Sequence, residues 1–161
     1  MKNNYALVTG ATSGIGLEIA RSLANRDYNL VLVARREEQL NAVASEIKND
    51  FGVDVEVFSA DLANPRAPDD IYTFCTSKNI NVEILINNAG YALPNQFHKT
   101  PMQDEEDCLR VLGISVIALT KIFLPNMLER GSGKIMIVSS VASFAPPSTI
   151  QVLYGPVKTF M

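Results

Sequence analysis

Short apolar runs alternate with amphipathic segments along most of the chain. The apolar runs are continuous, as is typical of strands that are buried on both faces of a parallel sheet. They lie at residues 5–9, 30–34, 53–59, 82–87 and 134–139. Between them, apolar residues recur at the spacing of a helix face. This pattern predicts helices over 15–25, 37–48, 65–78 and about 104–129, and the opening of a further helix over about 149–161.

The alternation of strands and helices predicts an α/β fold built from parallel β-α-β units with right-handed crossovers. We expect a Rossmann-like, doubly wound parallel sheet with strand order 3-2-1-4-5, which ends after the fifth strand and the start of the next helix. A ligand site should lie beyond the carboxyl ends of the strands. The length, with 47% hydrophobic and 19% charged residues, suits one globular domain over 1–161. Asn64 is a candidate N-cap, with Pro65 in the first turn of its helix.

Charge and cysteine usage exclude several classes of partner. The net charge of −3 gives no electrostatic reason to expect nucleic acid or an anionic membrane. Cys75 and Cys108 have no CxxC neighbour, so we expect two buried thiols, with neither a disulfide nor a metal site. His98, the one histidine, is expected to face solvent. No signal-peptide pattern and no apolar run near the ~20 residues of a membrane span is apparent, which predicts a cytoplasmic protein.

The first apolar run leads directly into a glycine-rich turn and then a helix. Residues 9–16 read TGATSGIG, with the spacing GxxxGxG rather than GxGxxG. A pyrophosphate binds backbone N–H groups at a helix start, where the dipole also favours negative charge, and glycines leave room for it. A tight turn without a ligand has the same local sequence, but the strand–turn–helix context favours a dinucleotide.

The end of the second strand distinguishes the two nicotinamide cofactors. An NAD enzyme needs a carboxylate there for the ribose hydroxyls, whereas an NADP enzyme needs cations for the 2′-phosphate. The chain reads Val33-Ala34-Arg35-Arg36, so a neutral residue is followed by two guanidinium groups that can pair with phosphate. The alternative is that the two arginines begin a solvated helix. We expect NADP(H) to be preferred over NAD(H).

Two further motifs follow in order. The fourth strand ends in Asn-Asn-Ala-Gly at residues 87–90, and Tyr154 is followed by Lys158 at the i+4 spacing that shares a helix face. Together with TGATSGIG, they resemble the short-chain dehydrogenase/reductase family over nearly the whole chain. The resemblance implies cofactor contacts from Gly10, Thr12, Ser13, Gly14, Ile15, Gly16, Arg35, Arg36, Asp61, Leu62, Asn88, Ala89, Gly90, Tyr154 and Lys158.

The same resemblance implies a catalytic group of Ser140, Tyr154 and Lys158. Tyr154 would be the general acid/base, while Lys158 would favour its phenolate form and hold the nicotinamide ribose. Ser140 would polarise the substrate oxygen. Ser139 is the alternative, although its expected role is to stabilise the end of the strand. The predicted function is NADP(H)-dependent hydride transfer to or from a small carbonyl or alcohol substrate. The alternative is an inert, nucleotide-binding remnant of such an enzyme.

The chain departs from the family pattern at several places. Leu112 stands where the family often has an asparagine that supports a proton relay, and leucine cannot hold a water. One extra residue lies between the serine and the tyrosine, which the pair Pro146-Pro147 could absorb. Pro156 lies inside the tyrosine–lysine segment and is harmless only in a first turn. The family also continues further, with two more strands and a lid, and its members usually form homo-oligomers.

Overall fold

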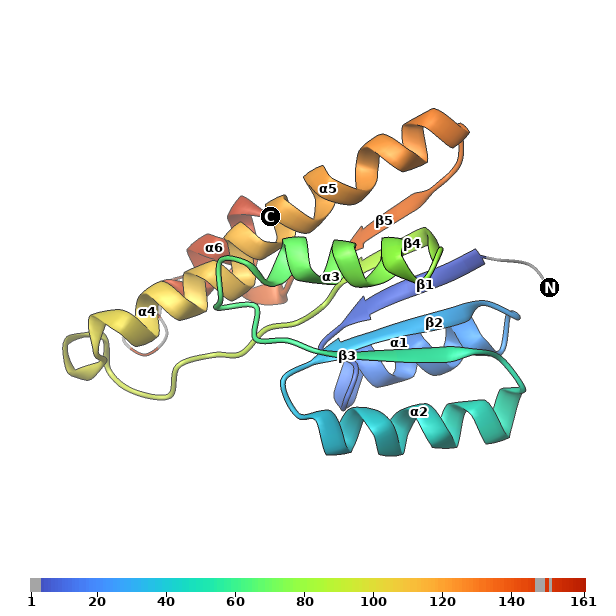
Figure 1. The fold of residues 1–161 in the computed structure, drawn as a ribbon. Coiled ribbons are helices and arrows are strands. Elements are labelled where there is room, and N and C mark those ends of the chain that lie inside the picture. Colours follow the sequence, from blue (N-terminus) through green and yellow to red (C-terminus); the bar gives the residue numbers. More distant parts are fainter. Residues whose placement is uncertain (1–3, 147–149, 151) are drawn as a thin grey trace.

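A five-stranded parallel sheet with the order β3-β2-β1-β4-β5 forms the centre of the protein (Figure 1). The computed structural model describes residues 4–146, 150 and 152–161. The strands are β1 (Asn4–Thr9), β2 (Asn29–Ala34), β3 (Val55–Ser59), β4 (Asn81–Asn87) and β5 (Lys134–Ile137). The predicted fold class and strand order are therefore confirmed.

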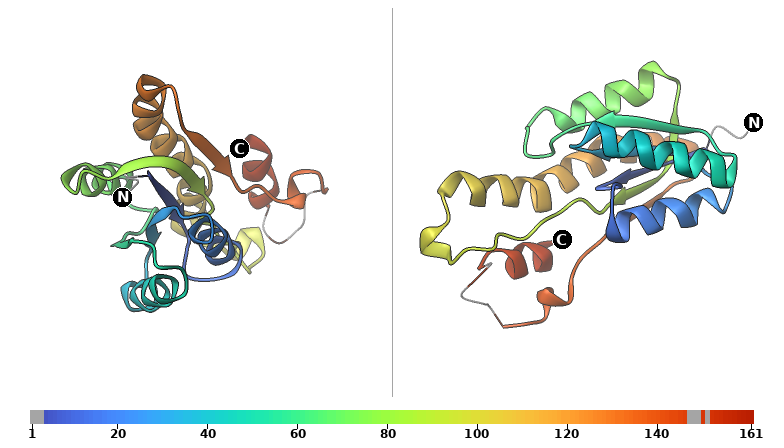
Figure 2. Two further views of the ribbon diagram at one scale, coloured as in Figure 1. Left: turned by 90° about the vertical axis from the view of Figure 1, so that its right-hand side faces the viewer. Right: turned by 90° about the horizontal axis from the view of Figure 1, so that it is seen from below.

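Helices cover both faces of the sheet (Figure 2). Successive side chains of a strand point to opposite faces, so the central strands contribute to two cores, one under each layer of helices. Ala6, Val8 and Leu32 pack with α1 (Gly14–Ala24) and α2 (Glu37–Phe51). Leu7 and Val31 face the other way, and pack with α3 (Ala67–Ser77) and α5 (Ser115–Arg130). The central strands are thus apolar on both faces, which explains their continuous hydrophobic runs.

The long helix predicted over 104–129 is three segments in one continuous path. It comprises α4 (Met102–Leu109), a π-helical segment η2 (Arg110–Ile114) and α5. The π segment was not foreseen, because its one glycine, Gly113, is also tolerated in ordinary helix. Such segments often occur at functional sites, and this one contains Leu112.

The expectation that no segment is apolar enough for a membrane span was wrong for this helix. From Met102 to Arg130 it is long and apolar enough to cross a membrane, judged by length and composition alone. The core helix of a soluble protein passes the same test. Here Leu119, Phe123 and Met127 are buried in the core that includes α3. Packing within the protein therefore accounts for part of its apolar composition, since 44% of the apolar window is buried.

Two predicted helix starts differ from the structure. Helix α3 begins at Ala67 with Arg66 as its N-cap, so Asn64 and Pro65 precede it. The Asn64 side chain instead accepts a hydrogen bond from the Arg66 backbone N–H at 3.0 Å, which forms a turn before the helix.

Helix α6 (Tyr154–Phe160) starts at the predicted catalytic tyrosine rather than near residue 149. Residues 147–149 and 151, including Pro147 of the proline pair, lie outside the described residues. Pro156 lies in the first turn of α6, as required, because the N–H groups there have no helical partner. The preceding strand β5 ends at Ile137, two residues earlier than predicted, and forms one edge of the sheet.

The end of β1 is tied to the end of β4 by two polar side chains. The Thr9 hydroxyl donates to the Ile86 carbonyl at 3.2 Å and accepts from the Asn88 and Ala89 backbone N–H groups at 3.0 Å. The Asn88 amide donates back to the carbonyls of Thr9 at 2.9 Å and Gly10 at 3.3 Å. These bonds hold the glycine turn beside the Asn-Asn-Ala-Gly segment.

Gly10 and Gly16 permit this close approach. A Cβ at Gly10 would lie 2.8 Å from the Ala89 Cα, and Gly10 also has a φ of +68°. A Cβ at Gly16 would overlap the Gly10 carbonyl and the Asn88 amide. Glycine is therefore required at both positions by the packing of the turn on β4, independently of any ligand.

We expect Gly10→Ala to lower the unfolding free energy more than Gly52→Ala. Both glycines have a φ of +68°, but nothing lies within 4 Å of a Cβ at Gly52. Gly52→Ala should cost about 1 kcal/mol for the left-handed conformation alone. Gly10→Ala should cost a further ~1–3 kcal/mol for overpacking. Urea unfolding measures both values, and equal losses would show that the contact with Ala89 relaxes without penalty.

Candidate functional site

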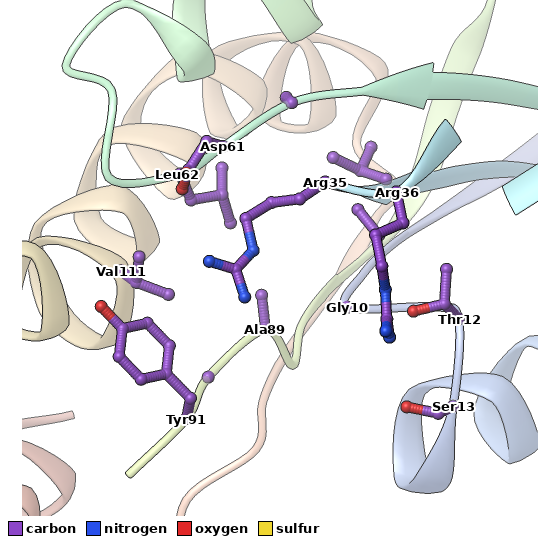
Figure 3. A pocket seen from close by; sticks show the side chains of 14 residues that line it. Gly10, Thr12, Ser13, Arg35, Arg36, Asp61, Leu62, Ala89, Tyr91 and Val111 are labelled. Carbon is purple, nitrogen blue, oxygen red and sulfur yellow. The ribbon is translucent and has the colours of Figure 1, made fainter. Parts of the chain in front are cut away.

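A pocket lies at the carboxyl ends of β1 to β4, where the chain order of the sheet reverses (Figure 3). The glycine turn, the end of β2, the segment after β3 and the segment after β4 form its wall. Its lining includes Gly10, Thr12, Ser13, Arg35, Arg36, Asp61, Leu62, Ala89 and Gly90, all of which were predicted cofactor contacts. It also includes Val33, Ala34, Ala60, Tyr91 and Val111, which were not.

Two guanidinium groups make this pocket electropositive. Arg35 and Arg36 follow β2 directly, and both side chains are exposed to solvent. Figure 3 shows the Arg35 side chain reaching across towards Tyr91, and that of Arg36 reaching towards the glycine turn. Asp61 supplies the acidic group of the lining, and its carboxylate accepts the Ala63 backbone N–H at 3.0 Å. The end of β2 therefore presents cations and no carboxylate.

The first turn of α1 leaves backbone donors near the same pocket. Ser13 is the N-cap in an extended conformation, and its side chain makes no capping hydrogen bond in the structure as described. The N–H groups at a helix start have no helical partners, so they can bind an anion. Gly14 and Gly16 lie in this turn without lining the pocket, and Ile15 is 64% exposed. Asn88 acts beneath the turn through its hydrogen bonds to β1.

Tyr154 and Lys158 lie together in α6, and neither lines the pocket described above. The Lys158 Nζ lies 5.9 Å from the centre of the Tyr154 ring and donates to the Val138 carbonyl at 2.7 Å. Lys158 is only 8% exposed. Burial lowers the pKa of Lys158, an effect that nearby Cys108 opposes. The ammonium is thus held by the backbone between β5 and α6, close to the tyrosine ring.

The two candidate serines have different contacts. The Ser140 hydroxyl accepts the Ala142 backbone N–H at 3.1 Å and caps the short helix η3 (Val141–Ser143). The Ser139 hydroxyl donates to the Lys158 carbonyl at 2.9 Å. Ser139 therefore joins the segment after β5 to α6, the kind of contact expected of a residue that stabilises the strand end. The catalytic roles of these serines, and those of Tyr154 and Lys158, stay predictions.

Gly90 connects the pocket to the lysine. A Cβ at Gly90 would lie 2.6 Å from the Leu112 Cδ2 and 3.9 Å from the Lys158 Nζ. Leu112 is 1% exposed and packs with Cys108 and Val157. The Leu112 side chain, which extends from the π segment, therefore fills the space beside Gly90 with an apolar methyl group.

The cysteines and the histidine lie as expected. Cys75 and Cys108 are buried free thiols. Burial raises the pKa of Cys75 to about 12 and also raises that of Cys108, so both favour the unreactive thiol. His98 is exposed. Within residues 4–146, 150 and 152–161, no group of His, Cys, Asp and Glu could hold a metal ion.

Known proteins match both the sequence and the fold. The family model "short chain dehydrogenase" matches residues 4–161. The very-long-chain 3-oxoacyl-CoA reductases of Anas platyrhynchos and Homo sapiens are 35% and 34% identical, over 98% of this chain and 51% of their own. A short-chain dehydrogenase from Sphingobium yanoikuyae in complex with NADPH superimposes with a TM-score of 0.89 at 33% identity, over 98% of this chain and 61% of that one.

The chain thus spans about half the length of the curated relatives that it matches. The match nonetheless extends from β1 to α6 and includes each of the motifs that line the pocket or flank the lysine. On this basis, the chain belongs to the short-chain dehydrogenase family.

Proposed function

We propose that the protein containing this chain is an NADP(H)-dependent oxidoreductase that acts on a carbonyl or alcohol group. The pair Arg35 and Arg36 at the end of β2, with Ala34 in place of a carboxylate, is the observation that carries the cofactor preference. A carboxylate there would repel a 2′-phosphate, whereas guanidinium groups pair with it bidentately. The NADPH bound to the Sphingobium neighbour is consistent with this choice.

The proposed cofactor position follows the pocket from β2 to α6. Arg35 and Arg36 would hold the 2′-phosphate, and the N-terminus of α1 would hold the pyrophosphate. Asp61 and Leu62 would contact the adenine ring. Gly90 lies close to Lys158, which would hold the nicotinamide ribose. When bound, the cofactor supplies or accepts the hydride.

The chain's own residues would move the proton. The Tyr154 hydroxyl would give its proton to the substrate oxygen during reduction, and take it back during oxidation. Lys158 would stabilise the phenolate that remains, because its ammonium is 5.9 Å from the ring centre. Ser140 would donate a hydrogen bond to the substrate oxygen. A cytoplasmic location and a homo-oligomeric full-length form also stay predictions.

A second candidate function is nucleotide binding without turnover. Leu112 favours it, because this buried side chain packs beside Gly90 at the position where the family resemblance implies a relay asparagine. No proton can pass through its methyl groups. An inert chain of this kind would bind NADPH and release it unchanged.

Replacing Arg35 or Arg36 with methionine should weaken NADPH binding by about tenfold or more, since each loses a charge-assisted hydrogen bond. NADH lacks the 2′-phosphate, so its affinity should change much less. Calorimetric titration of the 161-residue chain measures both constants. Arg26→Met is the matched control, because Arg26 lies in the turn between α1 and β2, at the amino ends of the strands, and does not line the pocket. Equal losses for the two cofactors would contradict the assignment.

Tyr154→Phe should lower the rate of NADPH oxidation with a 3-oxoacyl-CoA by about 100-fold or more, because the proton donor is removed. The curated relatives' names supply this first test substrate. NADPH affinity should stay within about twofold, since phenylalanine keeps the ring. If the unmodified protein binds NADPH but turns over no carbonyl compound, the second candidate function is favoured instead.

Lys158 should make folding more stable as the pH rises. Its pKa in the folded state lies below its ordinary value of 10.5 because of burial. Between these two values the unfolded chain binds more protons, so the unfolding free energy increases with pH. Urea unfolding should therefore show a wild-type advantage over Lys158→Met that grows as the pH rises, and levels off above the ordinary value. Lys158→Arg stays protonated, so its own advantage in unfolding free energy over Lys158→Met should not rise with pH. A wild-type advantage over Lys158→Met that stays constant with pH would contradict the lowered pKa of Lys158.

A further inference from the structure

Tyr91 faces Arg35 across the pocket and has no role in the motifs described above. It directly follows Gly90, and its half-buried ring lines the pocket. The guanidinium carbon of Arg35 lies 5.8 Å from the centre of this ring, within the range of a cation–π interaction (Figure 3). Burial raises the pKa of Tyr91, so the ring is neutral and the contact is made by its π face.

The tyrosine side of this contact is well anchored. Tyr91 packs against the core of α3 and α5 and also against the cluster that contains Leu112. Its backbone carbonyl accepts the Cys108 thiol at 3.7 Å. On the arginine side, the Ser59 hydroxyl donates to the Arg35 backbone carbonyl at 3.0 Å. Among the described residues, no carboxylate forms an ion pair with the Arg35 guanidinium.

We infer that Tyr91 is a positioning residue for Arg35 and thereby contributes to the selection of NADP(H) over NAD(H). This inference rests on the proposed function. A free arginine side chain loses much rotamer freedom when it binds a phosphate, and holding it beforehand reduces that loss. The guanidinium carbon lies over the tyrosine ring, and this contact uses none of the arginine N–H donors in a hydrogen bond, so they stay available for a phosphate.

The ring, rather than the hydroxyl, should carry the effect. In Figure 3 the Tyr91 hydroxyl points away from the glycine turn and from Arg36. Tyr91→Phe keeps the π face and removes only the hydroxyl, whereas Tyr91→Leu keeps an apolar side chain and removes the π face. These two variants therefore separate the cation–π contact from simple packing.

The experiment is a calorimetric titration of the 161-residue chain with NADPH and, separately, with NADH. Tyr91→Leu should weaken NADPH binding about two- to fivefold, the size expected for an exposed cation–π contact, and leave NADH binding nearly unchanged. Tyr91→Phe should leave both affinities unchanged. In an Arg35→Met background, Tyr91→Leu should no longer alter the ratio of the two affinities, whereas in an Arg36→Met background it should still do so.

Phe74→Leu is the matched control, because Lys78 lies 5.0 Å from the Phe74 ring centre at the far end of α3. It removes a cation–π contact remote from the pocket and should not alter the ratio. If Tyr91→Leu weakens the binding of NADPH and NADH equally, Tyr91 has only a packing role. If Tyr91→Leu makes NADPH bind more tightly, the contact between Tyr91 and Arg35 competes with the cofactor. Either result overturns the inference about Tyr91 and leaves the proposed function standing. The same holds if Tyr91→Leu leaves the ratio of the NADPH and NADH affinities unaltered while NADPH is still preferred. Absence of NADPH binding by the folded chain overturns the proposed function as well.

Discussion

The junction between the ends of β1 and β4 is the contact on which the rest of the structure depends. Thr9 and Asn88 exchange hydrogen bonds with each other's backbone, and Gly10 and Gly16 remove the side chains that would separate the two segments. The ends of parallel strands that lead to opposite sides of a sheet normally diverge, and a ligand site forms between them. Here the divergence starts only after the junction, so the glycine turn and the Asn-Asn-Ala-Gly segment form two adjacent walls of one pocket.

The glycines of the TGATSGIG motif are required for two different physical reasons. Gly10 and Gly16 are required by the neighbouring backbone, whereas Gly14 has a φ of +57° and nothing within 4 Å of a Cβ. Glycine is therefore favoured at position 14 by the left-handed backbone conformation of the turn, and the space beside it is open to a ligand. A glycine-rich sequence cannot by itself separate these causes, because all three positions look alike before the fold is known.

The sheet could be predicted from the sequence, because the two cores require a simple hydrophobic pattern in the strands and helices. Strands covered on two faces must be apolar throughout, and the helices between them must be apolar on one face only. The predicted start of α3 was wrong because Asn64 and Pro65 also suit a turn. The Asn64 side chain accepts the Arg66 backbone N–H in that turn instead of capping the helix. The π segment around Leu112 could not be foreseen, since hydrophobic spacing barely differs between neighbouring helical forms.

The site was predicted to the extent that its residues lie in recognisable motifs. Arg35, Arg36, Asp61 and the glycine turn meet in one pocket, but Tyr91 and Val111 complete its wall without a sequence signal. Tyr91 acquires its place only because the segment after β4 runs beside the end of β2, a contact between residues far apart in the chain. It also packs against the cluster around Leu112, which in turn lies beside Gly90 and Lys158. The Leu112 cluster therefore packs against Tyr91, which faces Arg35, and lies beside Gly90 and Lys158, so residues at both ends of the proposed cofactor site adjoin the same cluster.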